Sequence, residues 1–121
     1  MEKVDTLNRR QKGFYGEDQA ADYLVSQGYV IVNRNYQTKR GEIDCIATAP
    51  DGTLVFIEVK SARSLAYGNP LFRVTRAKQQ QIAKMAQMYL KEHKFTSQKC
   101  RFDVIGIVGN KIDHLRNAFL T

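Results

Sequence analysis

The sequence has no tryptophan, only two prolines and only two cysteines in 121 residues. Cys45 and Cys100 both lie in apolar, strand-like runs and neither belongs to a CxxC pair, which argues against a disulfide framework and against a zinc site. No apolar run approaches the roughly 18 residues that a membrane span needs. Residues 1–13 also lack the apolar stretch of a secretory signal. We therefore expect a reduced, cytoplasmic protein that does not associate with membranes.

Acidic residues are the scarcer charged class, with 12 Asp and Glu against 19 Lys and Arg. The net charge of +7 and the pI of about 9.6 favour binding to polyanions, of which nucleic acid is the commonest in the cytoplasm. Many small basic proteins have no such partner, so charge alone decides little. The length fits one domain with its own core. We expect a flexible basic arm over residues 1–12 and a single domain over residues 13–121.

Hydrophobic periodicity and turn residues predict seven elements in the order α-β-β-β-α-β-β. One helix is expected over residues 14–27, with Gly28 as its left-handed cap, and another from the N-cap Thr75 to about residue 93. The second helix buries a stripe of Ile82, Met85, Ala86 and Tyr89. Strands are expected over residues 29–32, in the two halves of 42–62, and over 101–108 and 111–119. This order predicts an α/β fold with a mixed sheet flanked by helices.

A Pro-Asp-Gly sequence at residues 50–52 predicts a tight turn between two strands of a hairpin. If the residues that flank this turn pair, Asp44 lies opposite Glu58 and Glu42 lies opposite Lys60. Alternate residues of a strand share one face, so all four side chains point to the same side of the sheet. Directly opposite side chains have Cβ atoms roughly 5 Å apart, so two carboxylates placed in this way repel each other. A divalent cation between them would remove this cost.

A third acid and a base complete the predicted site. Glu17 shares the inward face of the first helix with Ala20 and Ala21, where a carboxylate needs a partner or a purpose. Lys60 is in place to orient or deprotonate a water molecule, or to balance charge on a reacting phosphate.

These residues resemble the PD-(D/E)xK nuclease superfamily. Glu58-Val59-Lys60 is similar to the ExK half of its motif, Asp44 to the preceding aspartate and Glu17 to the glutamate of its first helix, although Ile43 stands where the motif has proline. The chain also resembles the YraN-like family of small bacterial proteins over about residues 13–120. The stretches that carry this likeness are Gly16-Glu17, Gly41-Glu42-Ile43-Asp44, Phe56-Ile57-Glu58-Val59-Lys60, Arg101-Phe102-Asp103-Val104 and Asn117-Ala118-Phe119. In fold order and acidic residues it is similar to archaeal Holliday junction resolvases.

The resemblance implies a restriction-endonuclease-like core that hydrolyses phosphodiester bonds in nucleic acid, more readily DNA than RNA. Asp44 and Glu58 would bind Mg²⁺ or Mn²⁺ with the carbonyl of Val59, Glu17 would complete the site, and Lys60 would be the catalytic lysine. A homodimer that presents two active sites is compatible with this activity. Some members of the superfamily keep the fold and bind nucleic acid without cutting it.

Other residues have a functional and a plain interpretation. Glu42 is either a supporting ligand or a salt-bridge partner of Lys60, and Lys78 and Gln81 either reach the site or face solvent. Arg101 and Asp103 fit an internal pair, and neither His93 nor His114 has the spacing of a metal ligand. The residues that would line a substrate path, or otherwise lie in solvent, are Arg34, Tyr36, Lys39, Arg40, Arg63, Tyr67, Arg73 and Arg76.

Three hypotheses follow from the sequence. The first is a metal-dependent endonuclease, the second a catalytically silent nucleic-acid-binding protein with the same fold, and the third a structural or partner-binding protein whose acids form only salt bridges.

Overall fold

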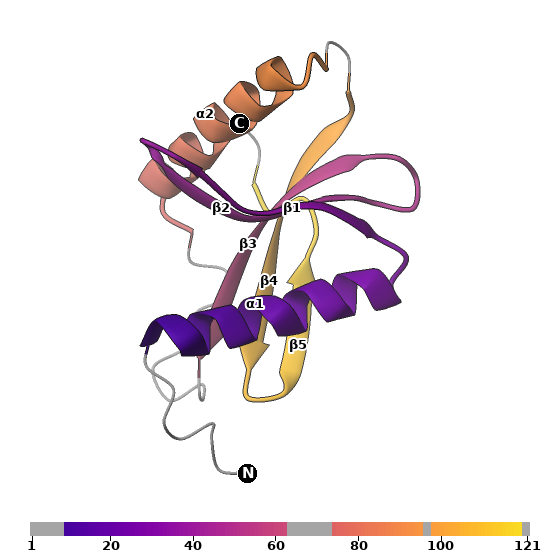
Figure 1. Ribbon diagram of the computed structural model, residues 1–121. Coiled ribbons are helices and arrows are strands. Elements are labelled where there is room, and N and C mark those ends of the chain that lie inside the picture. The colour runs from indigo at the N-terminus through magenta and orange to yellow at the C-terminus, as the bar shows by residue number, and fades with distance from the viewer. Residues whose placement is uncertain (1–8, 63–73, 96–97, 120–121) are drawn as a thin grey trace.

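The computed structural model describes residues 9–62, 74–95 and 98–119. Its elements are α1 (Arg9–Ser26), β1 (Val30–Thr38), β2 (Gly41–Thr48), β3 (Leu54–Ala62), α2 (Arg76–Glu92), β4 (Cys100–Val108) and β5 (Lys111–Leu115). The strands form one sheet in the order β1-β2-β3-β4-β5, in which β3 and β4 run parallel and the other neighbours run antiparallel. α1 covers one face of the twisted sheet and α2 the other (Figure 1). The predicted mixed sheet flanked by helices is confirmed.

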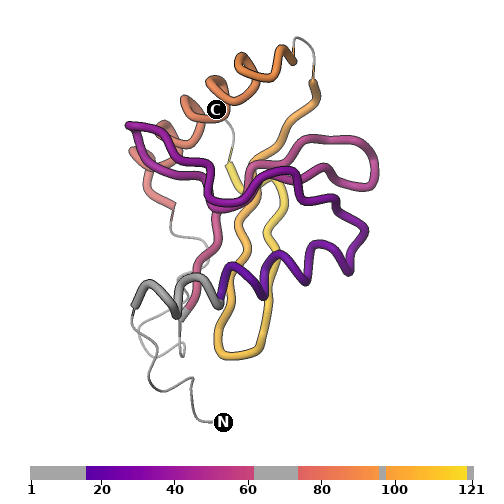
Figure 2. The backbone as a smooth tube through the Cα atoms, in the orientation of Figure 1, coloured from indigo at the N-terminus to yellow at the C-terminus, as the bar shows by residue number. Residues whose placement is uncertain are grey.

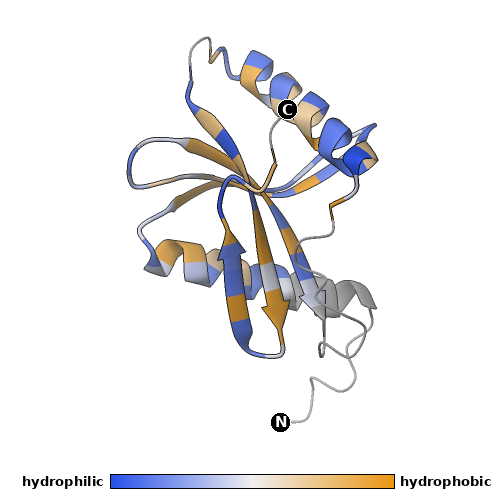
Figure 3. Ribbon diagram, turned by 180° about the vertical axis from the view of Figure 1, so that it is seen from behind, coloured by the Kyte–Doolittle hydropathy of each residue, from blue (hydrophilic) through white to orange (hydrophobic). Residues whose placement is uncertain are grey.

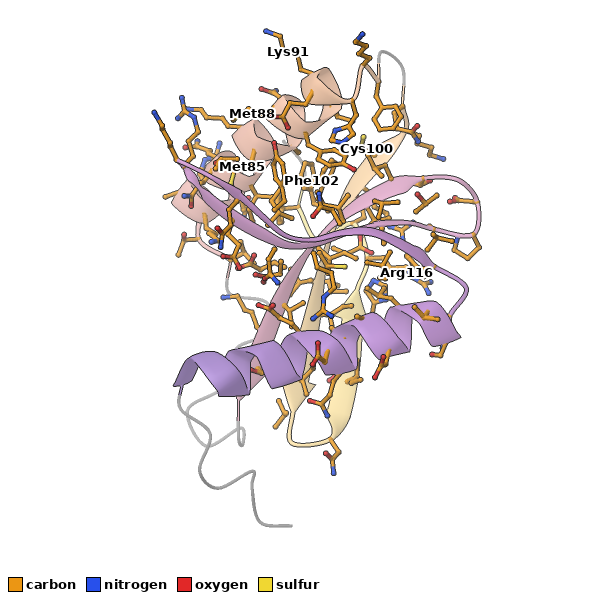
Figure 4. The ribbon with its side chains drawn as sticks, in the orientation of Figure 1. Met85, Met88, Lys91, Cys100, Phe102 and Arg116 are labelled. Carbon is orange, nitrogen blue, oxygen red and sulfur yellow. The ribbon has the colours of Figure 1, made fainter. Side chains whose placement is uncertain are left out.

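Two apolar clusters hold the helices to the sheet. Side chains of successive strand residues point to opposite faces, so each central strand supplies both clusters. On the α2 side the cluster includes Ile46, Phe56, Met85 and Val104. On the α1 side it includes Leu24, Val55, Ile57 and Ile105. In Figure 3, β4 is largely hydrophobic while β5 alternates, as expected for a central and an edge strand. Met85 and Phe102 lie between α2 and the sheet, and Lys91 extends away from the helix (Figure 4).

The helix predictions are confirmed for α2 and corrected for α1. The Thr75 hydroxyl accepts a hydrogen bond from the Lys78 N–H at 3.1 Å, and the predicted stripe of α2 is buried throughout. α1 begins at Arg9 rather than near residue 14, so residues 9–12 are helical instead of belonging to the predicted arm. Arg, Gln and Lys are good helix formers, and no proline interrupts them. The rest of that arm, residues 1–8, lies outside the described residues.

The predicted turn and register of the β2–β3 hairpin are confirmed near the turn. The Ala49 N–H donates to the Thr53 carbonyl at 2.8 Å, and Gly52 has φ +91°, a conformation that glycine adopts without steric cost. The paired residues run from Thr48–Leu54 to Cys45–Ile57. The sequence prediction that Asp44 lies opposite Glu58 was based on this same register.

Two strands differ in length from their predictions. β1 continues beyond the predicted end at residue 32 as far as Thr38, and its hairpin with β2 runs along α2 (Figure 2). β5 ends at Leu115, short of the predicted residue 119. It ends there because Asn117 takes φ +53° and the following Ala118 N–H donates to the Phe102 carbonyl at 2.7 Å.

Candidate metal centre

The candidate centre lies where β2 and β3 separate. Counted from the turn, the ladder of paired residues stops at Cys45–Ile57, and Asp44 is the next residue along β2. The Asp44 carboxylate then accepts a hydrogen bond from the Val59 backbone N–H, with 2.8 Å from Oδ2 to the nitrogen. A side chain thus satisfies a strand donor that a backbone carbonyl would otherwise bind. Asp44 is therefore held between the two strands, and the predicted ladder pairs Asp44–Glu58 and Glu42–Lys60 are not formed.

Glu58 nevertheless lies beside Asp44. The charge of Asp44 acts on the Glu58 carboxyl and raises its pKa, and the Lys78 ammonium of α2 is 3.8 Å from Glu58 Oε2. The other oxygen, Oε1, is buried and has no hydrogen-bond partner within the part of the chain that the structure describes. A buried carboxylate oxygen normally has a partner. This open acceptor is what a bound cation or its water would satisfy.

Glu17 and Glu42 bring two more carboxylates to Asp44. One oxygen from each of the three side chains lies within 4.8 Å of the others. α1 reaches this position because it approaches β3 closely at Gly16, where a Cβ would stand 3.3 Å from Ser61 Oγ. Glu42, which the sequence left open as either a supporting ligand or a salt-bridge partner of Lys60, thus belongs to the same cluster as Glu17.

The electrostatics of the centre favour protonated acids when no cation is present. Burial, together with the charges of Asp44 and Glu42, raises the pKa of Glu17 to about 7. Burial and the charge of Asp44 raise the pKa of Glu58 to about 7, against the opposing effect of Lys78 and Lys60. Burial likewise raises the pKa of Asp44. Because a cation competes with these protons, its affinity should increase with pH.

The raised pKa values predict that the metal-free protein loses stability as pH rises. Between pH 4.5 and about 7 the folded chain binds more protons at Glu17 and Glu58 than the unfolded chain does. The free energy of unfolding therefore falls with pH across this window. We expect the melting temperature in EDTA to drop by roughly 5 °C from pH 5 to pH 8, as a destabilisation of about 1 kcal/mol or more would produce.

Differential scanning calorimetry across this pH range measures the effect. The variant Glu17→Gln with Glu58→Gln is the control and should show a flatter profile. An unchanged slope in that variant would assign the pH dependence to other groups.

The donor set fits a hard divalent cation. Mg²⁺ and Mn²⁺ prefer carboxylate and carbonyl oxygens, and opposite ligands of a six-coordinate Mg²⁺ stand roughly 4 Å apart. One oxygen from each of the three clustered carboxylates lies within 4.8 Å of the other two, an upper limit that is compatible with ligands of one ion. Within the described residues, neither histidine nor cysteine contributes to this cluster, so softer metals such as zinc are not favoured.

The remaining predicted site residues lie at different distances from the acids. Lys78 reaches Glu58, as described, and the Gln81 side chain packs directly against the backbone of Gly41, next to Glu42. Arg40 is exposed in the β1–β2 turn, where its N–H donates to the Thr38 hydroxyl at 3.0 Å. Arg63, Tyr67 and Arg73 lie outside the described residues.

A groove of about 520 Å³ lies between the β1–β2 hairpin and α2. Its lining residues are Tyr36, Gln37, Thr38, Lys39, Arg40, Met88 and Glu92. Three of the predicted substrate-path residues therefore gather here. Arg34, in contrast, forms an exposed ion pair with Asp18 of α1 at 2.6 Å.

Sequence reasoning missed Asn35 of β1. Turned with its nitrogen toward the acids, the Asn35 amide donates to Glu17 Oε1 at 2.9 Å and to Glu42 Oε2 at 3.0 Å. The residue has φ +55°, which is uncommon for a side-chain-bearing residue but easiest for Asn and Asp. The available signal was an asparagine within a strand extension, which is too common to be informative.

A second polar cluster lies under α1, and the sequence predicted only part of it. Asp103, fully buried, accepts hydrogen bonds from Arg101 Nε at 3.0 Å, His114 Nε2 at 2.7 Å and the Asn117 N–H at 2.9 Å. The Arg101–Asp103 pair was expected, whereas His114 had no assigned partner. His114 Nδ1 is 3.0 Å from the Tyr23 hydroxyl, so this cluster connects α1, β4 and β5. It is a structural network.

The structure also tests two broader predictions. Cys45 is buried and Cys100 half-buried, and both are free thiols, as expected. Among the described residues, no helix combines the length and apolar character required to cross a membrane.

Comparison with known proteins places the chain in a family. Residues 16–107 match the family described as "Uncharacterised protein family UPF0102". This chain belongs to the UPF0102 family. The likeness to the YraN-like family is thereby confirmed, and the matched range contains Glu17, Glu42, Asp44, Glu58 and Lys60.

Relatives match over most of their length. The UPF0102 protein of Trichlorobacter lovleyi is 45% identical over 112 residues, which cover 88% of each chain. That of Persephonella marina is 44% identical over 108 residues, covering 89% of this chain and 92% of the relative. Among solved structures, the "Structure of EndoMS-dsDNA2 complex" is similar with a TM-score of 0.44 and 16% identity over 72% of this chain. The chain spans 34% of that protein.

Proposed function

We propose that this UPF0102 protein is a metal-dependent endonuclease that hydrolyses phosphodiester bonds in nucleic acid, more readily DNA than RNA. The clustering of three carboxylates from α1 and β2, with the half-buried Glu58 of β3 interacting electrostatically with Asp44, supports this proposal most strongly. The fold would then be a restriction-endonuclease-like core. Lys60 belongs to the same site because its charge acts on Glu58. Burying like charges together is costly unless a cation compensates them.

Each residue would have a separate role. Asp44, Glu58 and Glu17 would hold Mg²⁺ or Mn²⁺, with Glu42 beside them and the Val59 carbonyl as a further ligand. When bound, such an ion polarises the phosphate and makes water a better nucleophile. The Lys60 ammonium would orient the attacking water and balance negative charge that develops on the phosphate. Lys78 would favour the ionised form of Glu58 through its opposite charge.

Calorimetric titration with Mn²⁺ at pH 8 tests the metal site. Wild type should bind, and Asp44→Asn should bind at least 100-fold more weakly, because the substitution removes a charged ligand but leaves an oxygen for the Val59 N–H. The exposed Asp113 of β5 offers a matched control, and Asp113→Asn should bind as wild type does. Absence of Mn²⁺ binding by wild type would leave the acids with only structural roles.

A cleavage assay separates the enzyme from a silent nucleic-acid-binding protein. Branched, single-stranded and duplex DNA, with matched RNA, are incubated with wild type and Asp44→Asn in Mn²⁺. Cleavage by wild type alone supports the proposal. In the non-cleaving alternative, Lys39 and Arg40 of the groove are residues that would bind nucleic acid. In that case no substrate is cut, yet binding persists and weakens steeply with salt.

A further inference from the structure

Asn35 occupies an unusual place in β1. It lies between the pairs Arg34–Cys45 and Tyr36–Ile43 of the β1–β2 ladder, and therefore across from Asp44. Its φ of +55° departs from the extended backbone of its neighbours. An ordinary side chain meets steric conflict in this left-handed conformation, which Asn and Asp tolerate best. The strand thus accepts a local irregularity at the position next to the acids.

The amide of Asn35 contacts two carboxylates that come from different elements. It donates to Glu17 Oε1 at 2.9 Å and to Glu42 Oε2 at 3.0 Å, so α1 and β2 meet at one side-chain nitrogen. Asparagine is neutral and carries two N–H donors on a short side chain. Aspartate would tolerate the backbone but repel both acids. The same two acids have oxygens within 4.8 Å of Asp44.

We propose that Asn35 is a positioning residue that holds Glu17 and Glu42 at the separation needed for both to face one divalent cation. This inference rests on the proposed function, since it assumes a cation at these acids. Asn35 would act through these two carboxylates. Partners that orient metal ligands in this way change metal affinity by about 10- to 100-fold when they are removed.

The test compares Mn²⁺ affinity in two glycine variants by calorimetry at pH 8. Asn35→Gly keeps the left-handed backbone accessible and removes only the amide. Asn117→Gly is the matched control, because Asn117 also has a left-handed φ, of +53°. We expect about 10- to 100-fold weaker Mn²⁺ binding for Asn35→Gly, wild-type affinity for Asn117→Gly, and folded circular dichroism spectra for both.

The outcomes separate this inference from the proposed function. If wild type binds Mn²⁺ and Asn35→Gly binds equally well, Asn35 has only a backbone role and the inference is overturned. If wild type binds no Mn²⁺, both the inference and the metal site are overturned.

A second variant covers the case in which Asn35→Gly does not fold. Asn35→Asp should lower the melting temperature in EDTA at pH 8 by several degrees, because a carboxylate replaces the donor between two acids. An unchanged melting temperature would mean that Asn35 serves only the backbone conformation, which Asp also tolerates.

Discussion

Lys60→Ala is expected to lower the rate of metal-dependent cleavage by roughly 10²- to 10⁴-fold, the range over which positioned proton-transfer and charge-stabilising groups act. Lys60 lies on β3, two residues after Glu58, and its charge lowers the pKa of that carboxyl. The substitution removes the ammonium but none of the proposed metal ligands. Substrate binding, to which several basic residues would contribute, should change much less than the cleavage rate.

Single-turnover cleavage with saturating Mn²⁺ and substrate measures this effect directly. Lys111→Ala removes an exposed lysine from β5 and is the matched control, which should cleave at the wild-type rate. Circular dichroism and a filter-binding assay confirm that the Lys60→Ala variant folds and binds substrate. A Lys60→Ala protein as active as wild type would remove this lysine from the mechanism.

Asp103→Ala is expected to cost about 3–5 kcal/mol of folding free energy, the loss typical when one partner of a buried ion pair is removed. The Asp103 side chain is fully buried and accepts hydrogen bonds from Arg101, His114 and the Asn117 N–H. Burial raises the pKa of Asp103, but these hydrogen bonds outweigh burial and hold the pKa below its usual value. Without the carboxylate, a half-buried guanidinium and a buried imidazole lose their acceptor.

Urea unfolding at pH 7 measures the free energy of unfolding of this variant. Asp113→Asn, on the exposed face of β5, is the control and should change stability by less than about 0.5 kcal/mol. The folded fraction of Asp103→Ala should still bind Mn²⁺, since Asp103 belongs to the network under α1 and not to the acidic site. A stability loss below about 1 kcal/mol would show that the network contributes little.

Local sequence patterns predicted the elements that depend on local physics. The Pro-Asp-Gly turn determined the hairpin register, because a short loop allows few alignments of its strands. The Thr75 cap and the stripe of α2 followed from helical periodicity. The start of α1 was predicted too late, because a polar helical turn such as residues 9–12 has no apolar pattern to reveal it.

The acidic site was predicted in outline and corrected in detail. Asp44, Glu58 and Glu17 are close together, as the register and the inward face of the helix predicted. The predicted pairing of Glu42 with Lys60 across a continuous ladder was wrong, because the Asp44 carboxylate binds the Val59 N–H and the strands separate. Sequence cannot show that a side chain replaces a backbone acceptor.

By itself, the sequence determined which acids share a face, since strand alternation and turn length are local properties of the chain. Only the tertiary structure decided how α1 and β1 meet those acids. Asn35 bridges Glu17 and Glu42, and His114 reaches Asp103, through contacts between segments that are distant in the chain. Such contacts depend on how the helices pack on the twisted sheet, which no short stretch of residues specifies.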